Sequence, residues 1–117
     1  MNTQPTPLLS EFEQGLPIPE GELAYFRERT RNRLYNFVVS KFLEREAADN
    51  LTKADLARRI NQRPERVNRL LGAPENWTID TISDLLVGIA AEELDPASSS
   101  LNCAHSTKML RMALAWE

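Results

Sequence analysis

Residues 51–71, LTKADLARRINQRPERVNRLL, decide how this chain folds. They contain two short helical patterns on either side of a three-residue break, residues 61–63. Apolar residues recur at helical spacing through both patterns, at Leu56, Ala57, Ile60, Val67 and Leu70. Two short helices joined by a tight turn, with arginines concentrated in the second, are the pattern of a helix-turn-helix.

Local signals at the helix ends support these boundaries. Thr52 is suited to cap the first helix, and Asp55 stands three residues later, at the reciprocal position of a capping box. Asn61 is suited to a positive φ, which tight turns between helices often need. Pro64 then falls at the first position of the second helix, where its missing N–H removes no hydrogen bond. We expect that helix to stop at Gly72.

Two more helices are expected around this pair. Residues 20–49 carry apolar side chains at helical spacing without an internal proline, and Asn50 is suited to the left-handed conformation that ends helices. A later helix should begin after an N-cap at Thr78 and end near Glu93. Its expected inner stripe is Ile79, Ile82, Leu85, Leu86 and Ile89.

The predicted fold class is all-α, because no segment shows the alternation of a β-strand. Residues 1–20 hold four prolines and are predicted to form an extended N-terminal arm. Residues 21–94 are predicted to form the helix-turn-helix domain, with a long first helix. Residues 95–117 are predicted to be a linker and an extra C-terminal helix, a candidate for dimerisation or partner binding.

The charge is unevenly distributed along the chain. Between Arg27 and Arg69 there are 12 Lys or Arg and 6 Asp or Glu, a balance of +6. The remainder holds 2 basic and 11 acidic residues, a balance of −9, and the whole chain has a formal net charge of −3. A basic centre between acidic ends favours a localised phosphate-binding face over nucleic-acid binding along the whole surface.

The sequence offers little support for an enzyme. It contains no paired nucleophile and base and no Gly-rich phosphate loop, so we expect no catalytic residue and no cofactor. Cys103 and His105 are two residues apart, but a metal site needs three or four ligands, so no metal is expected. No apolar run approaches the length of a membrane span, and the first residues lack the pattern of a signal peptide. We therefore expect a soluble cytoplasmic protein.

The motif LTKADLARRI, the turn after it, the segment VNRLLG and the segment NWTIDTI together resemble the XRE family of Cro and lambda-repressor type. The resemblance covers roughly residues 30–93. It implies a compact lambda-repressor-like bundle of about five helices that binds double-stranded operator DNA as a homodimer. The chain departs from the family pattern at Asn61, where glycine is usual, and at Arg63, where a Ser or Thr cap is usual.

Helical spacing indicates which residues would face DNA. If Val67 and Leu70 point inward, the remaining positions of the second helix point outward. We expect arginines there to bridge O6 and N7 of guanine, Asn68 to pair with adenine and Glu65 to accept from cytosine. The expected base-contacting residues are Gln62, Glu65, Arg66, Asn68 and Arg69, although Gln62 is equally suited to a phosphate. The expected phosphate-contacting residues are Thr52, Lys53 and Arg63.

The leading functional interpretation is a sequence-specific DNA-binding transcriptional regulator, a repressor acting as a homodimer. One alternative is the antitoxin of a toxin–antitoxin pair, which would repress its own operon. It would bind a toxin through the ends of the chain that lie outside the resemblance to the XRE family. Another is a protein-interaction module that has the same fold without DNA binding, which the negative net charge favours.

Overall fold

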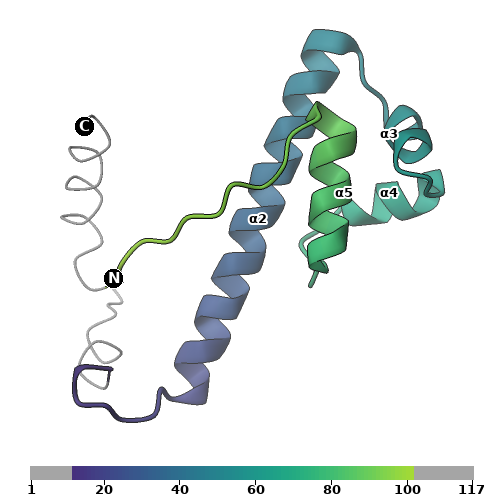
Figure 1. Cartoon of the computed structure of the whole chain (residues 1–117). Helices are drawn as coiled ribbons and strands as arrows, with labels where there is room; N and C mark the ends of the chain where they lie inside the picture. Colours follow the sequence, from purple (N-terminus) through teal and green to yellow (C-terminus); the bar gives the residue numbers. More distant parts are fainter. Residues whose placement is uncertain (1–11, 102–117) are drawn as a thin grey trace, which may run out of the picture. The chain divides into compact units, whose positions relative to one another are not determined.

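The computed structural model describes residues 12–101, and these form helices joined by loops, with no strand among them. The predicted all-α class is confirmed for this part of the chain. The helices are α2 (Glu20–Asp49), α3 (Lys53–Arg59), α4 (Pro64–Leu70) and α5 (Ile79–Ala90) (Figure 1). The expected C-terminal helix, the Cys103–His105 pair and the first part of the N-terminal arm lie outside the described residues.

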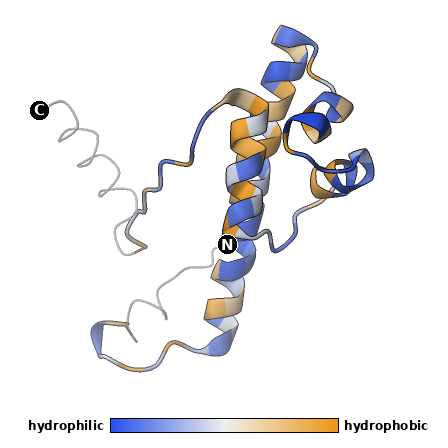
Figure 2. Ribbon diagram, turned by 45° about the vertical axis from the view of Figure 1, so that its right-hand side comes forward, coloured by the Kyte–Doolittle hydropathy of each residue, from blue (hydrophilic) through white to orange (hydrophobic). Residues whose placement is uncertain are grey.

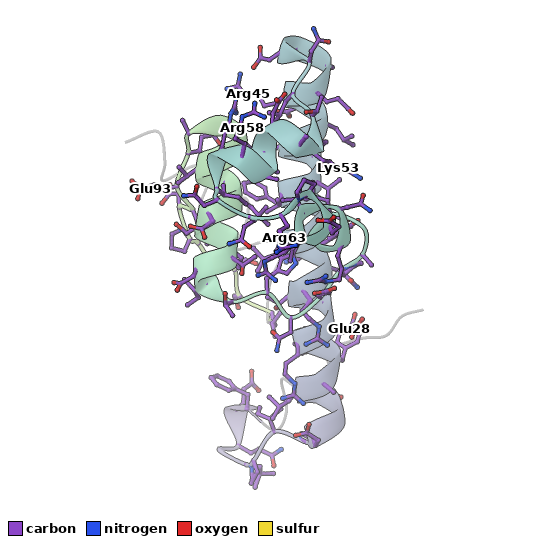
Figure 3. All side chains as sticks on the ribbon, turned by 90° about the vertical axis from the view of Figure 1, so that its right-hand side faces the viewer. Glu28, Arg45, Lys53, Arg58, Arg63 and Glu93 are labelled. Atoms are coloured by element: carbon purple, nitrogen blue, oxygen red, sulfur yellow. The ribbon has the colours of Figure 1, made fainter. Side chains whose placement is uncertain are left out.

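The chain divides into two compact units, of which one, Phe26–Asp95, contains α3, α4, α5 and most of α2. Within this unit, α3 and α4 lie across one side of α2 and α5 (Figures 1 and 3). All four helices contribute to a single core. Its members are Val38, Phe42, Leu51, Leu56, Ala57, Val67, Leu70, Leu71, Ile82, Leu85, Leu86 and Ile89. No polar or charged residue is buried within the described part of the chain.

Helix α2 has the predicted bounds. It begins with Glu20 and Glu22 in its first turn, where acidic side chains suit the helix dipole. It ends before Asn50, whose φ of 60° is the predicted left-handed conformation. Only the later turns of its apolar stripe reach the core, where Val38 and Phe42 are buried.

Helices α3 and α4 form as the local signals predict. The capping box at the start of α3 is complete, since Asp55 N donates to Thr52 Oγ1 and Thr52 N donates to Asp55 Oδ2. In the turn, Asn61 has a φ of 57°. Pro64 occupies the first position of α4, and Arg63 at its N-cap makes no side-chain capping bond. The bounds of the two helices and the conformation of the turn are therefore as predicted, and α4 ends with Leu71 as its C-cap, directly before Gly72.

Helix α5 differs from the prediction at both ends. Thr78 caps it as expected, but Ile79 is 82 % exposed, so its place in the inner stripe was wrongly predicted. Periodicity shows the direction of a side chain, but it does not show how far the neighbouring helices extend to cover it. The helix also ends at Ala90, not near Glu93, because Ala91 adopts the left-handed conformation. Between these ends α5 is strongly hydrophobic, in contrast to the hydrophilic α3 (Figure 2).

Candidate nucleic-acid interface

Helix α4 buries one side and exposes the other. Val67 and Leu70 are buried with 0 % and 4 % exposure, so the predicted inward direction of this side is confirmed. Glu65, Asn68 and Arg69 are exposed, and Arg66 is half-buried. Because its inner side belongs to the core, α4 presents these polar side chains from a fixed position.

An open hollow of about 650 Å³ lies at the turn between α3 and α4. Three guanidinium groups and one carboxylate line it, which gives the lining a formal charge of +2. Figure 3 shows Arg63 on the side of the unit that α3 and α4 form. The lining residues are Asn61, Gln62, Arg63, Glu65, Arg66 and Arg69. The structure thus brings together four of the five expected base-contacting residues with one expected phosphate-contacting residue.

The fifth expected base-contacting residue, Asn68, is paired within the protein. Lys53 Nζ donates a hydrogen bond of 2.9 Å to Asn68 Oδ1, so the first residue of α3 is joined to the outer side of α4. Lys53 and Asn68 are both exposed and do not line the hollow. The sequence places them 15 residues apart, and no pattern in it indicates that they meet.

Thr52 and Asp55 cap the N-terminus of α3. The Thr52 hydroxyl oxygen accepts from Asp55 N at 3.0 Å, which leaves its O–H free to donate. Asp55 also accepts a hydrogen bond of 2.7 Å from Arg58. The Arg58 guanidinium, and then the donors of Thr52, hold the pKa of Asp55 below its ordinary value. A carboxylate therefore stands beside the expected phosphate contacts and partly offsets their positive field.

Two aromatic side chains hold the end of α4. The Tyr35 hydroxyl of α2 donates a hydrogen bond of 2.7 Å to the main-chain carbonyl of Leu71, the C-cap residue. The ring of Trp77 lies 6.0 Å from that of Tyr35, and Trp77 packs against the core as a structural residue. The hydrogen bond joins the C-terminal end of α4 to α2, and Trp77 packs beside Tyr35 and the core.

A contact that was not predicted from the sequence holds α3 against α5. Arg59 Nη1 donates a hydrogen bond of 2.8 Å to the Gly88 carbonyl. The glycine permits this approach, because an added Cβ would lie 2.5 Å from Ile60 Cγ2 and 2.8 Å from Leu56 Cδ1. A glycine within an otherwise apolar helix is a signal of such close packing, although its partner cannot be read from the sequence.

On α2, Arg31 forms an ion pair of 2.9 Å with Glu28 of the same helix. Within residues 12–101, no three His, Cys, Asp or Glu side chains form a group that could hold a metal ion. None of the helices described is both long and apolar enough to cross a bilayer.

Comparison of the chain with protein-family models, with curated proteins and with solved structures found no match.

Proposed function

We propose that this chain is a sequence-specific DNA-binding transcriptional regulator of the XRE type, a repressor that acts as a homodimer. The observation that supports the proposal most is the cationic hollow at an α3–turn–α4 unit whose second helix buries only its inner side. A helix of this kind can enter the major groove of DNA, which is about 12 Å wide.

Helix α4 is held in a fixed position, as a recognition helix should be. Tyr35 holds its C-terminal end through the Leu71 carbonyl, and Val67 anchors its middle in the core. A helix held in this way orients its outer side chains before DNA arrives, so less side-chain and backbone freedom is lost on binding.

The guanidinium groups of the hollow are suited to guanine. Arg69 is exposed and Arg66 is half-buried, and each can donate two parallel hydrogen bonds to O6 and N7 of one guanine. Arg63 stands at the N-cap of α4, where it is suited to a backbone phosphate. Glu65 can accept a hydrogen bond from a cytosine amino group. Where no cytosine is present, its carboxylate only repels the DNA phosphates, so it disfavours sequences that lack this base.

One reading helix contacts too few base pairs to select a single site in a genome. A homodimer that places two copies of α4 about 34 Å apart would read a palindromic site of two half-sites. This requirement for specificity is the reason to propose a dimer.

The experiment is a selection of bound duplexes from a random pool, followed by affinity measurements on the selected sequence. Arg66→Ala and Arg69→Ala are each expected to reduce the specific binding free energy by about 1–3 kcal/mol and to broaden base preference at the contacted position. The matched control is Arg45→Ala, because Arg45 pairs with Asp49 at 3.1 Å on α2, outside the hollow. Full selectivity in both α4 variants would contradict the assigned contacts.

A further inference from the structure

We propose that Lys53 orients the Asn68 amide so that Asn68 reads a keto base, guanine or thymine, in the major groove. The inference rests on the proposed DNA-binding function and names the base class that one position of the site selects. It assigns Asn68 a specificity different from the adenine pairing expected from its residue type alone.

The hydrogen bond between the two side chains determines which end of the amide remains available. A lysine ammonium has three N–H donors and no acceptor, so only the oxygen of an asparagine amide can face it. Asn68 Oδ1 accepts from Lys53 Nζ at 2.9 Å. The Nδ2 group of Asn68, with its two N–H donors, is therefore the end that remains to bind a ligand.

The pair is anchored at both ends. Lys53 is the first residue of α3, and the capping box between Thr52 and Asp55 fixes the backbone at this point. Asn68 follows Val67, which is fully buried in the core. The two side chains therefore meet because the α3–α4 packing brings their backbones together.

The Lys53 bond disfavours the pairing of Asn68 with adenine. Asparagine pairs with adenine through two bonds, one accepted from the N6 amino group by Oδ1 and one donated to N7 by Nδ2. Asn68 Oδ1 has two lone pairs, and Lys53 Nζ binds one of them at 2.9 Å, so the N6 amino group would have to approach the other beside a positive charge. While the Lys53 bond is kept, Oδ1 is therefore a weaker acceptor for the N6 amino group.

The N–H donors of Asn68 Nδ2 match the keto bases. In the major groove, guanine presents the acceptors O6 and N7 and thymine presents the acceptor O4, whereas adenine presents an amino N–H group beside its N7 acceptor and cytosine presents an amino N–H group. The positive charge of the Lys53 ammonium beside the amide adds to the preference for carbonyl oxygens. Two N–H groups of Lys53 remain for a phosphate, so Lys53 can act as a positioning residue and keep its expected backbone contact.

The test is the selection of duplexes from a random pool by the full chain and three variants. The unaltered chain is expected to select guanine or thymine at one position of each half-site, and Asn68→Ala to lose preference at that position alone. Lys53→Met removes the donor, frees Oδ1 and is expected to raise the share of adenine there by on the order of tenfold. Lys41→Met is the matched control, because Lys41 pairs with Glu92 at 2.9 Å and not with Asn68.

A second readout needs no DNA. In the free protein, the side-chain amide resonances of Asn68 in a nitrogen–proton correlation spectrum are expected to shift in Lys53→Met and to stay in place in Lys41→Met. Unshifted resonances in Lys53→Met would overturn the inference.

The outcomes separate this inference from the proposed function. Adenine at the Asn68-dependent position of the unaltered chain, an unchanged preference in Lys53→Met, or no position that depends on Asn68 would overturn the inference and leave DNA recognition intact. A chain that selects no sequence at all would overturn the proposed function and the inference with it.

Discussion

Gly88 of α5 lies so close to Ile60 that a Cβ added to the glycine would stand 2.5 Å from Ile60 Cγ2. The carbonyl oxygen of Gly88 also accepts a hydrogen bond from Arg59, so α3 is held against α5 at the residues just before the turn between α3 and α4. The orientation of the α3–α4 pair, and with it the direction of the hollow, depends on this close approach.

Gly88→Ala is therefore expected to destabilise the fold by about 1–3 kcal/mol, because Ile60 and Leu56 must move to admit the methyl group. Urea unfolding followed by circular dichroism measures the change. Ile60→Ala in the same chain removes the nearest clash, so the cost of the double variant should be less than the sum of the two single costs. Gly21→Ala is the control, since an added Cβ there meets nothing within 4 Å. Equal costs at Gly88 and Gly21 would contradict this explanation.

A second prediction concerns the end of α5. Ala91 has a φ of 55°, a conformation that costs a residue with a side chain roughly 1 kcal/mol and that glycine adopts freely. Ala91→Gly is expected to stabilise the protein by up to about 1 kcal/mol. Ala90→Gly, one residue earlier and still helical, should instead destabilise it by about 0.5–1 kcal/mol. The urea midpoints of the two variants should move in opposite directions, and shifts of the same sign would refute the assignment of the cap.

The capping box predicts a pH dependence of stability. The pKa of Asp55 is lowered in the folded protein by Arg58 and Thr52. A carboxyl with a lowered folded pKa stabilises the fold at pH values above its unfolded pKa, and this stabilisation is lost as the pH falls through the folded pKa. Asp55→Asn removes the titrating group, so the stability difference between the unaltered chain and the variant should shrink in acid. Urea titrations from neutral to acidic pH measure it, and a difference that grows in acid would contradict the prediction.

Features that depend on residues close together in the sequence could be predicted. The capping box at Thr52, the positive φ of Asn61, the first helical position of Pro64 and the cap at Thr78 all rest on signals within four residues of each other. The inward direction of Val67 also followed from helical spacing. These features define the α3–turn–α4 unit, which is why its geometry could be predicted.

Contacts between distant segments were not predictable. The hydrogen bonds from Tyr35 to Leu71 and from Lys53 to Asn68 join residues 36 and 15 positions apart, and they exist only because the helices pack in one particular arrangement. The exposure of Ile79 has the same origin, because periodicity does not show where the covering helices stop. In the candidate interface, spacing predicted which residues face outward, but it did not show that Asn68 is already bound within the chain.

The proposed binding of duplex DNA at the hollow of α3 and α4 is tested most directly by the salt dependence of affinity. We predict that the logarithm of the binding constant falls linearly with the logarithm of salt concentration, and that Arg63→Ala reduces the magnitude of the slope by about 1. Arg45→Ala, which removes the same charge outside the hollow, should leave the slope unchanged. No duplex binding at low salt, or binding that salt does not weaken, would contradict the account and favour a protein-interaction module.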